Sequence, residues 1–275
     1  MSLDRYAVFG HPVAHSLSPR IHSWFAEQTG ERIDYRAIEA PLDDFAGTLR
    51  DFFASGGRGA NVTVPFKGEA SMLADERDAR VERSGAANTL RRDADGRIRA
   101  FNTDGIGLLR DLVHNLGVDL AGRSVVLLGA GGAAAGVIEP LLEAGPACLI
   151  IGNRTPRRAQ ELARRFADLG PVAAEALADL PAADVIINAT AASLDGGLPE
   201  LAPGVVKSQT FAYDMVYAAR PTPFLARCRE LGAARTADGL GMLVEQAAEA
   251  FLIWRGVRPD TGGVLTRLRA SVAEV

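Results

Sequence analysis

Residues 123–136 read RSVVLLGAGGAAAG, and this stretch decides the fold of the second half of the chain. The run VVLL (125–128) predicts a buried strand, and the small residues after it predict a tight turn into a helix. Gly129, Gly131 and Ala134 match G-x-G-x-x-A, a pattern that lets a pyrophosphate approach the backbone where a helix begins. Glycine also suits a tight turn without any ligand. The position of the pattern, between a strand and a helix, favours a dinucleotide site.

Further apolar runs surround this stretch and alternate with helical segments. The runs are LIIGNR (149–154), DVIINAT (184–190) and FAYDMVY (211–217). Apolar strands that alternate with helices indicate a parallel sheet covered on both faces. We therefore predict a doubly wound, Rossmann-like domain.

The segment after the strand at 149–152 indicates which dinucleotide is bound. Sites for NAD carry an acidic residue about 20 positions after the glycine loop, which binds the ribose 2′-hydroxyl. Here Asn153, Arg154 and Thr155 follow that strand, and Arg158 lies one helical turn further on. Arginine at this point suits a 2′-phosphate, although arginines that open a surface helix can also be merely solvated. The position favours NADP(H).

The first hundred residues have a different pattern, which predicts a second α/β domain. Strands are expected at 6–10, 34–40 and 59–67, and Asp95-Gly96 is expected to turn a hairpin. Ser18-Pro19 is expected to open a helix with serine as the N-cap. We therefore predict two α/β lobes joined near residue 105. Residues 239–256 and the tail after them are expected to be helical.

Lys67 is one of only two lysines among 30 basic residues, and it follows the strand-like run NVTVPF (61–66). Unlike arginine, lysine can release its proton when its surroundings favour this. An ammonium can donate to a carbonyl oxygen as a hydride reaches the carbon, and the amine can take the proton back. Asp104, in NTDG (102–105), is the candidate partner. A surface Lys67 and an Asp104 that caps a helix are equally consistent with the spacing.

Composition limits the alternatives. The chain has 275 residues, 48% of them hydrophobic and 23% charged, with a net charge of −4. These values are typical of a soluble globular protein and give no field that attracts nucleic acid or an anionic membrane. No secretory signal or membrane span is expected. Cys148 and Cys228 are expected to be buried free thiols, as in a reducing cytoplasm, and no metal site is expected. His11, His15 and His22 are expected to be exposed or hydrogen-bonded.

Several stretches, taken in order, resemble the shikimate dehydrogenase family along nearly the whole chain. The stretches are SLSPRIH (16–22), NVTVPFK (61–67), GAANT (85–89), NTDG (102–105), GAGGAA (129–134), NRT (153–155), NAT (188–190), DMVY (214–217), TP (222–223) and DGLGMLVEQA (238–247). The chain departs from the family pattern at Ser23, Ser193 and Ala219.

The resemblance implies the reversible, NADP(H)-dependent reduction of 3-dehydroshikimate to shikimate, a step in aromatic amino-acid biosynthesis. It implies a substrate-binding domain (1–104), an NADP-binding Rossmann-like domain (105–237) and C-terminal helices (238–275) that pack back on the first. Lys67 and Asp104 would be the catalytic pair. The resemblance implies that the substrate is bound by Ser16, Ser18, Thr63, Lys67, Asn88, Asp104, Tyr217 and Gln246. It implies that the cofactor is bound by Gly129, Ala130, Gly131, Gly132, Ala133, Asn153, Arg154, Thr155, Arg158, Thr190, Met215 and Gly239.

Other functions stay open at this point. A quinate/shikimate dehydrogenase would have a broader choice of substrate or cofactor, and the arginines argue against NAD. A non-catalytic, NADP-responsive binding protein would not need both Lys67 and Asp104. A reductase of similar two-lobed form that acts on a folate or an acyl-tRNA would not need the serine loop or NTDG. We expect a cytoplasmic monomer or homodimer whose ligand partner is a small molecule.

Overall fold

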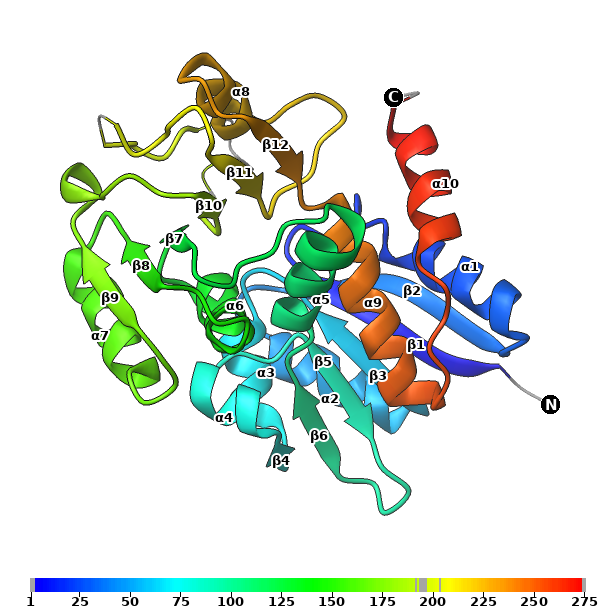
Figure 1. Ribbon diagram of the computed structural model, residues 1–275. Coiled ribbons are helices and arrows are strands. Elements are labelled where there is room, and N and C mark those ends of the chain that lie inside the picture. Colours follow the sequence, from blue (N-terminus) through cyan, green and yellow to red (C-terminus); the bar gives the residue numbers. More distant parts are fainter. Residues whose placement is uncertain (1–2, 191, 193–196, 203, 274–275) are drawn as a thin grey trace. The chain divides into compact units, whose positions relative to one another are not determined.

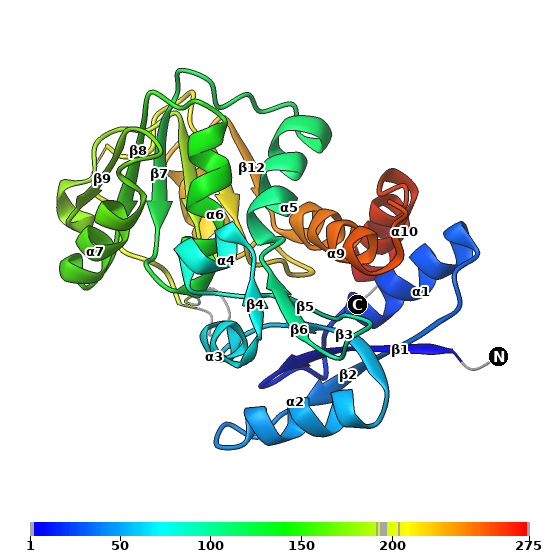
Figure 2. The ribbon, with the colours of Figure 1, turned by 90° about the horizontal axis from the view of Figure 1, so that it is seen from below.

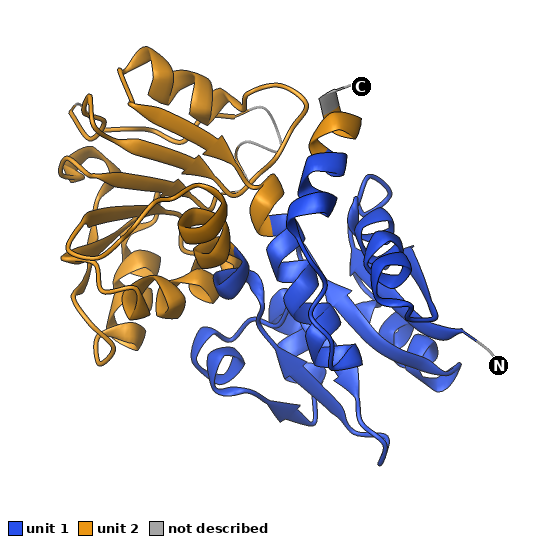
Figure 3. Cartoon of the chain, turned by 45° about the vertical axis from the view of Figure 1, so that its right-hand side comes forward, with its two compact units in different colours: residues 1–107, 243–268 blue, residues 108–242, 269–275 orange. Residues whose placement is uncertain are grey.

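The computed structural model describes residues 3–190, 192, 197–202 and 204–273. Its internal contacts divide the chain into two compact units, coloured separately in Figure 3. The first unit comprises residues 1–107 and 243–268, and the second comprises residues 108–242 and 269–275. Each contains a sheet with helices, so the predicted α/β class is confirmed.

The first unit is built on a mixed sheet of six strands in the order β2-β1-β3-β5-β6-β4. The strands are β1 (Asp4–Gly10), β2 (Ile33–Glu39), β3 (Gly57–Val62), β4 (Glu76–Arg77), β5 (Thr89–Arg92) and β6 (Ile98–Phe101). The helices are α1 (Ser18–Thr29), α2 (Phe45–Ala54), α3 (Lys67–Leu73), α4 (Ala79–Ser84), the start of α5 (Asp104–Arg110), most of α9 (Leu240–Arg255) and most of α10 (Gly262–Ala273). Figure 1 labels these elements.

Strand pairing in this sheet changes direction at β3. Strand β1 runs parallel to β2 and β3, whereas β5 runs antiparallel to β3 and β6. The predicted turn at Asp95-Gly96 joins β5 to β6, and Gly96 has a φ of +90°, a conformation that glycine adopts freely. This hairpin is therefore confirmed.

Helices cover both faces of this sheet, with α2 on one side and α1 and α9 on the other (Figure 2). The α2 side is apolar, and Phe9 packs there against Phe45 and Phe52. The α1 and α9 side holds an aromatic cluster in which His22 stacks on Tyr35 and lies beside Trp254. Nε1 of Trp254 also donates to the backbone oxygen of Leu90 on β5 (2.9 Å), which fixes α9 to the sheet.

The second unit is built on six strands in the order β12-β11-β10-β7-β8-β9, and every neighbouring pair is parallel. The strands are β7 (Ser124–Leu128), β8 (Cys148–Gly152), β9 (Val172–Glu175), β10 (Val185–Asn188), β11 (Phe211–Asp214) and β12 (Arg235–Asp238). The helices are the end of α5, η1 (Asp111–Asn115), α6 (Gly132–Glu143), α7 (Pro156–Phe166), η2 (Leu177–Asp179) and α8 (Pro223–Glu230). This arrangement confirms the predicted parallel, Rossmann-like sheet.

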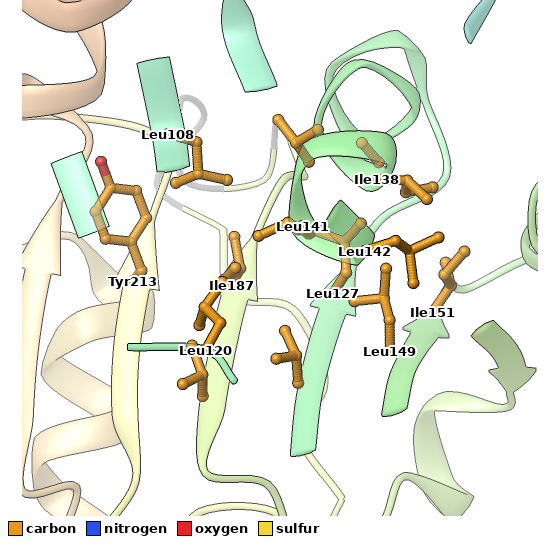
Figure 4. Close-up of a cluster of buried hydrophobic side chains, with 14 of the residues drawn as sticks. Leu108, Leu120, Leu127, Ile138, Leu141, Leu142, Leu149, Ile151, Ile187 and Tyr213 are labelled. Carbon is orange, nitrogen blue, oxygen red and sulfur yellow. The ribbon is translucent and has the colours of Figure 1, made fainter. Parts of the chain in front are cut away.

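Strand β7 shows why its sequence is continuously apolar. Val125 and Leu127 belong to the hydrophobic cluster formed with α6 and α7, part of which is drawn in Figure 4. Val126 and Leu128 point to the opposite face and belong to a second cluster formed with α8. Since successive side chains alternate between two buried faces, no position in the strand can be polar without a partner.

Three short strands were not expected from the sequence. Strands β4, β9 and β12 lie at sheet edges and lack a continuous apolar run. A half-exposed edge strand buries little apolar surface, so its sequence carries a weak signal. Among the described residues, no helix is long and apolar enough to cross a membrane.

Candidate active site

The glycine loop of the second unit joins β7 to α6. Gly129 has a φ of +113°, and a Cβ atom there would lie 3.2 Å from the backbone of Ala189. Gly131 is the N-cap of α6, whose first turn receives no hydrogen bond from a capping side chain. Among the described residues, no group outside the loop lies within 4 Å of a Cβ atom built on Gly131. The space beside Gly131, at the N-terminus of α6, fits an approaching pyrophosphate.

The sequence-predicted cofactor residues lie at the carboxyl ends of the parallel strands. Gly129 follows β7 and Asn153 follows β8, while Thr190, Met215 and Gly239 follow β10, β11 and β12 within two residues. Chain order reverses between β7 and β10, and ligands of doubly wound sheets bind at such a point. The loop itself supplies Ala130, Gly131, Gly132 and Ala133. These predicted cofactor residues therefore all lie at the carboxyl ends of the strands in the second unit.

A buried carboxylate supports two of these strand ends. Asp214, fully buried, accepts from Nδ2 of Asn188 (3.0 Å), from the backbone N–H of Val216 (3.1 Å) and from Oγ1 of Thr222 (2.6 Å). Asn188 in turn accepts from the backbone and the hydroxyl of Thr190. No role was predicted for Asn188, Asp214 or Thr222, and their hydrogen bonds support the loops after β10 and β11.

The arginines after β8 are available to an anionic ligand. Arg154, Thr155 and Arg158 are exposed at the start of α7. Within the described part of the chain, the guanidinium groups of Arg154 and Arg158 form no hydrogen bond or ion pair, whereas Arg157 pairs with Glu161. Two unpaired guanidinium groups beside the glycine loop suit a phosphate better than a neutral hydroxyl.

Lys67 and Asp104 meet in the first unit, where they form an ion pair. Lys67 is the first residue of α3 and Asp104 is the first residue of α5. Nζ of Lys67 donates to Oδ2 of Asp104 at 2.5 Å, and the two side chains are 15% and 6% exposed. This ion pair overturns the alternative of a surface lysine and supports a role for the two residues in proton transfer.

Asn88 connects this pair to α9. Its Nδ2 atom donates to Oδ1 of Asp104 (2.8 Å) and to Oε1 of Gln246 (3.3 Å). Helix α9 comes this close because Gly107 has no side chain, since a Cβ atom there would lie 2.6 Å from Cβ of Gln246. Thr63 is half-buried after β3, four residues before Lys67. The structure therefore gathers Asn88, Gln246 and the ion pair in one cluster.

The serine loop differs from its prediction in one respect. Leu17 is the N-cap of α1, and Ser18 is the first helical residue and makes no capping hydrogen bond. The prediction of Ser18 as N-cap was wrong, because Ser18 is itself helical and buried and so lies inside the first turn, not ahead of it. Oγ of Ser16, which is half-buried, accepts from the backbone N–H of Ser18 (3.3 Å).

His22 is buried, which corrects the expectation of an exposed or hydrogen-bonded ring. Its side chain is 0% exposed, and within the described residues neither ring nitrogen has a hydrogen-bond partner. Burial lowers the pKa of His22 to about 3, and the side chain of Asn61 opposes this shift. The imidazole is therefore neutral, and it stacks on Tyr35 at 4.1 Å between ring centres.

Sequence reasoning missed Tyr35 and gave Asn61 no role. The hydroxyl of Tyr35 donates to Oδ1 of Asn61 at 2.7 Å. A signal existed for Asn61, because it is a polar residue inside an apolar strand, and a buried amide requires partners.

Tyr217 and Ser193 follow strands β11 and β10 in the sequence. Tyr217 lies half-buried in the second unit, in the segment after β11. Ser193 lies outside the described residues. Among the described residues, no three histidine, cysteine, aspartate or glutamate side chains form a group that could hold a metal ion.

Family models match three parts of the chain. Residues 8–90 match the shikimate dehydrogenase substrate binding domain, and residues 111–195 match shikimate / quinate 5-dehydrogenase. Residues 239–269 match the shikimate 5′-dehydrogenase C-terminal domain. These three matches follow one another in the order that the resemblance implied.

Individual relatives are similar over almost the full length. A shikimate dehydrogenase (NADP(+)) of Hahella chejuensis is 55% identical, over 97% of this chain and 99% of that protein. The crystal structure of an Ael1 enzyme from Pseudomonas putida is 48% identical with a TM-score of 0.90, and covers 96% of this chain and 98% of its own. Shikimate 5-dehydrogenase from Thermus thermophilus, solved with NADP(H) and shikimate, is 35% identical with a TM-score of 0.86, over 98% of this chain and 100% of that one. The chain therefore belongs to the shikimate dehydrogenase family.

Proposed function

We propose that this protein is an NADP-dependent oxidoreductase that reversibly reduces 3-dehydroshikimate to shikimate. The observation that carries the proposal is the buried ion pair of Lys67 and Asp104 on a chain 55% identical to a shikimate dehydrogenase (NADP(+)). A solved family member at 35% identity holds both NADP(H) and shikimate.

In the proposed mechanism Lys67 moves the proton. When bound, NADPH supplies the hydride that reaches the carbonyl carbon of the substrate. Nζ of Lys67 donates a proton to the carbonyl oxygen as the C–O bond becomes that of an alcohol, and the resulting amine takes a proton back in the reverse direction. Asp104 orients the ammonium through Oδ2, at 2.5 Å, and Asn88 fixes the other carboxylate oxygen.

We propose that polar side chains bind the rest of the substrate. Ser16, Ser18 and Tyr217 bind its carboxylate, while Thr63, Asn88 and Gln246 join the ion pair in binding the ring hydroxyls. The family resemblance supports these roles, and so does the cluster of Asn88 and Gln246 beside Asp104. A site that pairs each hydroxyl discriminates strongly against analogues that lack one.

We propose that the second unit holds the cofactor. The pyrophosphate lies at the N-terminus of α6, against the loop Gly129–Ala133. The 2′-phosphate is bound by Arg154, Arg158, Thr155 and Asn153, and Thr190, Met215 and Gly239 complete the site. The space beside Gly131 supports this assignment, and so do Arg154 and Arg158, whose guanidinium groups form no ion pair within the described residues.

The domain roles follow from the same reasoning. We propose a substrate-binding domain at 1–104, an NADP-binding domain at 105–237 and C-terminal helices at 238–275 that pack back on the first domain. Helix α9 supports the last point, because Trp254 is hydrogen-bonded to β5. We also propose that the enzyme is cytoplasmic, acts as a monomer or homodimer, and binds neither nucleic acid nor membrane.

The test is a spectrophotometric assay of nicotinamide reduction with purified protein, which crosses shikimate and quinate with NADP and NAD. We expect the highest kcat/KM for shikimate with NADP. Quinate is the second candidate because the model matched by residues 111–195 is that of shikimate / quinate 5-dehydrogenase. Higher kcat/KM for quinate would establish that alternative, and inactivity with every pair would contradict both.

A further inference from the structure

A line of polar groups, which begins at the half-buried Tyr35 and is buried beyond it, connects the aromatic face of the first unit to Asp104. Tyr35, Asn61 and Thr89 come from β2, β3 and β5, and Asn61 and Thr89 are directly opposite each other in the antiparallel pair. Asn61 and Thr89 are 6% and 0% exposed. None of these three residues is part of the proposed substrate or cofactor site. We refer to Tyr35, Asn61 and Thr89 as the polar relay.

The direction of the relay at Asn61 is fixed by a backbone group. Nδ2 of Asn61 lies 3.2 Å from the backbone oxygen of Asn88, which can only accept a hydrogen bond. Oδ1 of Asn61 therefore faces the Tyr35 hydroxyl, which must donate, at 2.7 Å. Burial raises the pKa of Tyr35 well above its usual value, so the phenol keeps the proton that it donates.

A second backbone group fixes the direction at Asn88. The backbone N–H of Thr103 donates to Oδ1 of Asn88 at 2.8 Å. Thr89 accepts from Nδ2 of Asn61 (3.0 Å), so its hydroxyl hydrogen is free to go to Oδ1 of Asn88, also at 3.0 Å. The Thr103 hydroxyl is a third donor to the same oxygen, at 3.2 Å. With its oxygen held by these donors, Asn88 directs an N–H of Nδ2 to Asp104.

The titratable groups around the relay are few. Lys67 on α3 contacts Asp104, and His22 on α1 lies against Tyr35 with both ring nitrogens buried. Since burial lowers the pKa of His22 to about 3, its ring places no charge beside the relay near neutral pH. Hydrogen bonds inside such a dry network are strong, and an unpaired member is costly.

We propose that Tyr35, Asn61 and Thr89 are positioning residues for the catalytic pair. Through three consecutive hydrogen bonds they hold the amide of Asn88 with an N–H toward Asp104, which leaves Oδ2 of that carboxylate for Lys67. The inference rests on the proposed function, since it concerns the same pair of residues.

The test is Tyr35→Phe, which removes one hydroxyl and keeps the ring on His22. The matched control is Tyr6→Phe. Tyr6 is the partner of Tyr35 in the β1–β2 register and also lies on Trp254, but its hydroxyl contacts Arg255 and not the relay. We expect Tyr35→Phe to lower kcat about 5- to 50-fold with little change in the KM for NADPH, and Tyr6→Phe to stay within about twofold of wild type.

An Asn88→Ala background separates positioning from a general loss of structure. If the relay acts through Asn88, adding Tyr35→Phe to Asn88→Ala should lower kcat little further. If the two substitutions act independently, the double variant should show the product of the two single reductions in kcat. Asn61→Asp adds a sharper variant. It keeps the size of the side chain but replaces the donor at Nδ2 with an acceptor, so the Thr89 hydroxyl can donate to residue 61 in place of Asn88, and kcat falls at least as far.

If Tyr35→Phe does not fold, Thr89→Val tests the relay in its place. Its control is Thr210→Val, which removes an equally buried hydroxyl from the second unit, where it is bonded to the backbone of Ala183. If the wild type is active and kcat of Tyr35→Phe and Thr89→Val is no lower than that of their controls, the positioning role alone is overturned. A wild type that fails to reduce 3-dehydroshikimate with NADPH overturns the proposed function, and the relay proposal with it.

Discussion

Lys67 and Asn88 hold opposite oxygens of one carboxylate. Nζ of Lys67 donates to Oδ2 of Asp104 at 2.5 Å, and Nδ2 of Asn88 donates to Oδ1 at 2.8 Å. Two donors on two oxygens leave the carboxylate little freedom to rotate. Because the carboxylate is fixed, the Lys67 ammonium that it binds is also held in one position, as a proton donor requires.

Cofactor preference should depend on Arg154. Arg154→Ala removes a guanidinium group that we propose binds the 2′-phosphate, a contact that NADH cannot make. The ratio of kcat/KM for NADPH to that for NADH should fall about 10- to 100-fold. Arg157→Ala is the control, because that arginine pairs with Glu161 on the same helix. An unchanged ratio in the Arg154 variant would remove this residue from the site.

Gly129 and Gly131 should respond differently to a side chain. A Cβ atom on Gly131 would meet no other described group within 4 Å, so Gly131→Val should fold almost normally but raise the KM for NADPH about tenfold or more. Gly129 has a φ of +113°, so Gly129→Ala should lower the free energy of unfolding by about 1–2 kcal/mol. Denaturant titration and steady-state kinetics measure both quantities. Equal effects on KM and stability at the two positions would contradict the assignment.

Stability should depend on pH through His22. The pKa of His22 is lowered by burial to about 3 from 6.5, so the unfolded chain binds a proton that the folded protein excludes. The contribution of neutral His22 to the free energy of unfolding is fully present above about pH 6.5. It is lost as the pH falls toward 3, by at most about 1.4 kcal/mol per pH unit.

Denaturant titrations of the wild type and His22→Phe at several pH values test this. From about pH 6.5 to about pH 4.5 the wild type should lose about 2 to 3 kcal/mol relative to the variant. His15→Gln, at an exposed position, should follow the wild type. A parallel dependence in the wild type and His22→Phe would mean that the imidazole titrates normally in the folded protein.

Sequence reasoning succeeded where structure is local. The strand, turn and helix around Gly129 follow from neighbouring residues, and so does the hairpin at Asp95-Gly96. Lys67 and Asp104 were paired on chemical grounds, and their meeting depends on the positions of α3 and α5.

What sequence reasoning missed depends on distant contacts. Ser18 has the sequence features of an N-cap, but packing in the folded unit buries it inside the first turn, and local sequence cannot reveal that packing. His22 looks polar in the sequence, yet α1 places it among the rings of Tyr35, Phe251 and Trp254. The relay likewise joins three strands, and no spacing along the chain predicts which polar residues will face one another.

The central claim is that the amine of Lys67 transfers the proton, and the two lysines of this chain allow a clean measurement. Lys207 is exposed, so Lys207→Ala is a matched control for Lys67→Ala. We expect kcat for 3-dehydroshikimate reduction to fall about a hundred- to ten-thousand-fold in Lys67→Ala, with an unchanged circular dichroism spectrum, and to stay near wild type in Lys207→Ala. Near-normal turnover in Lys67→Ala would contradict the account.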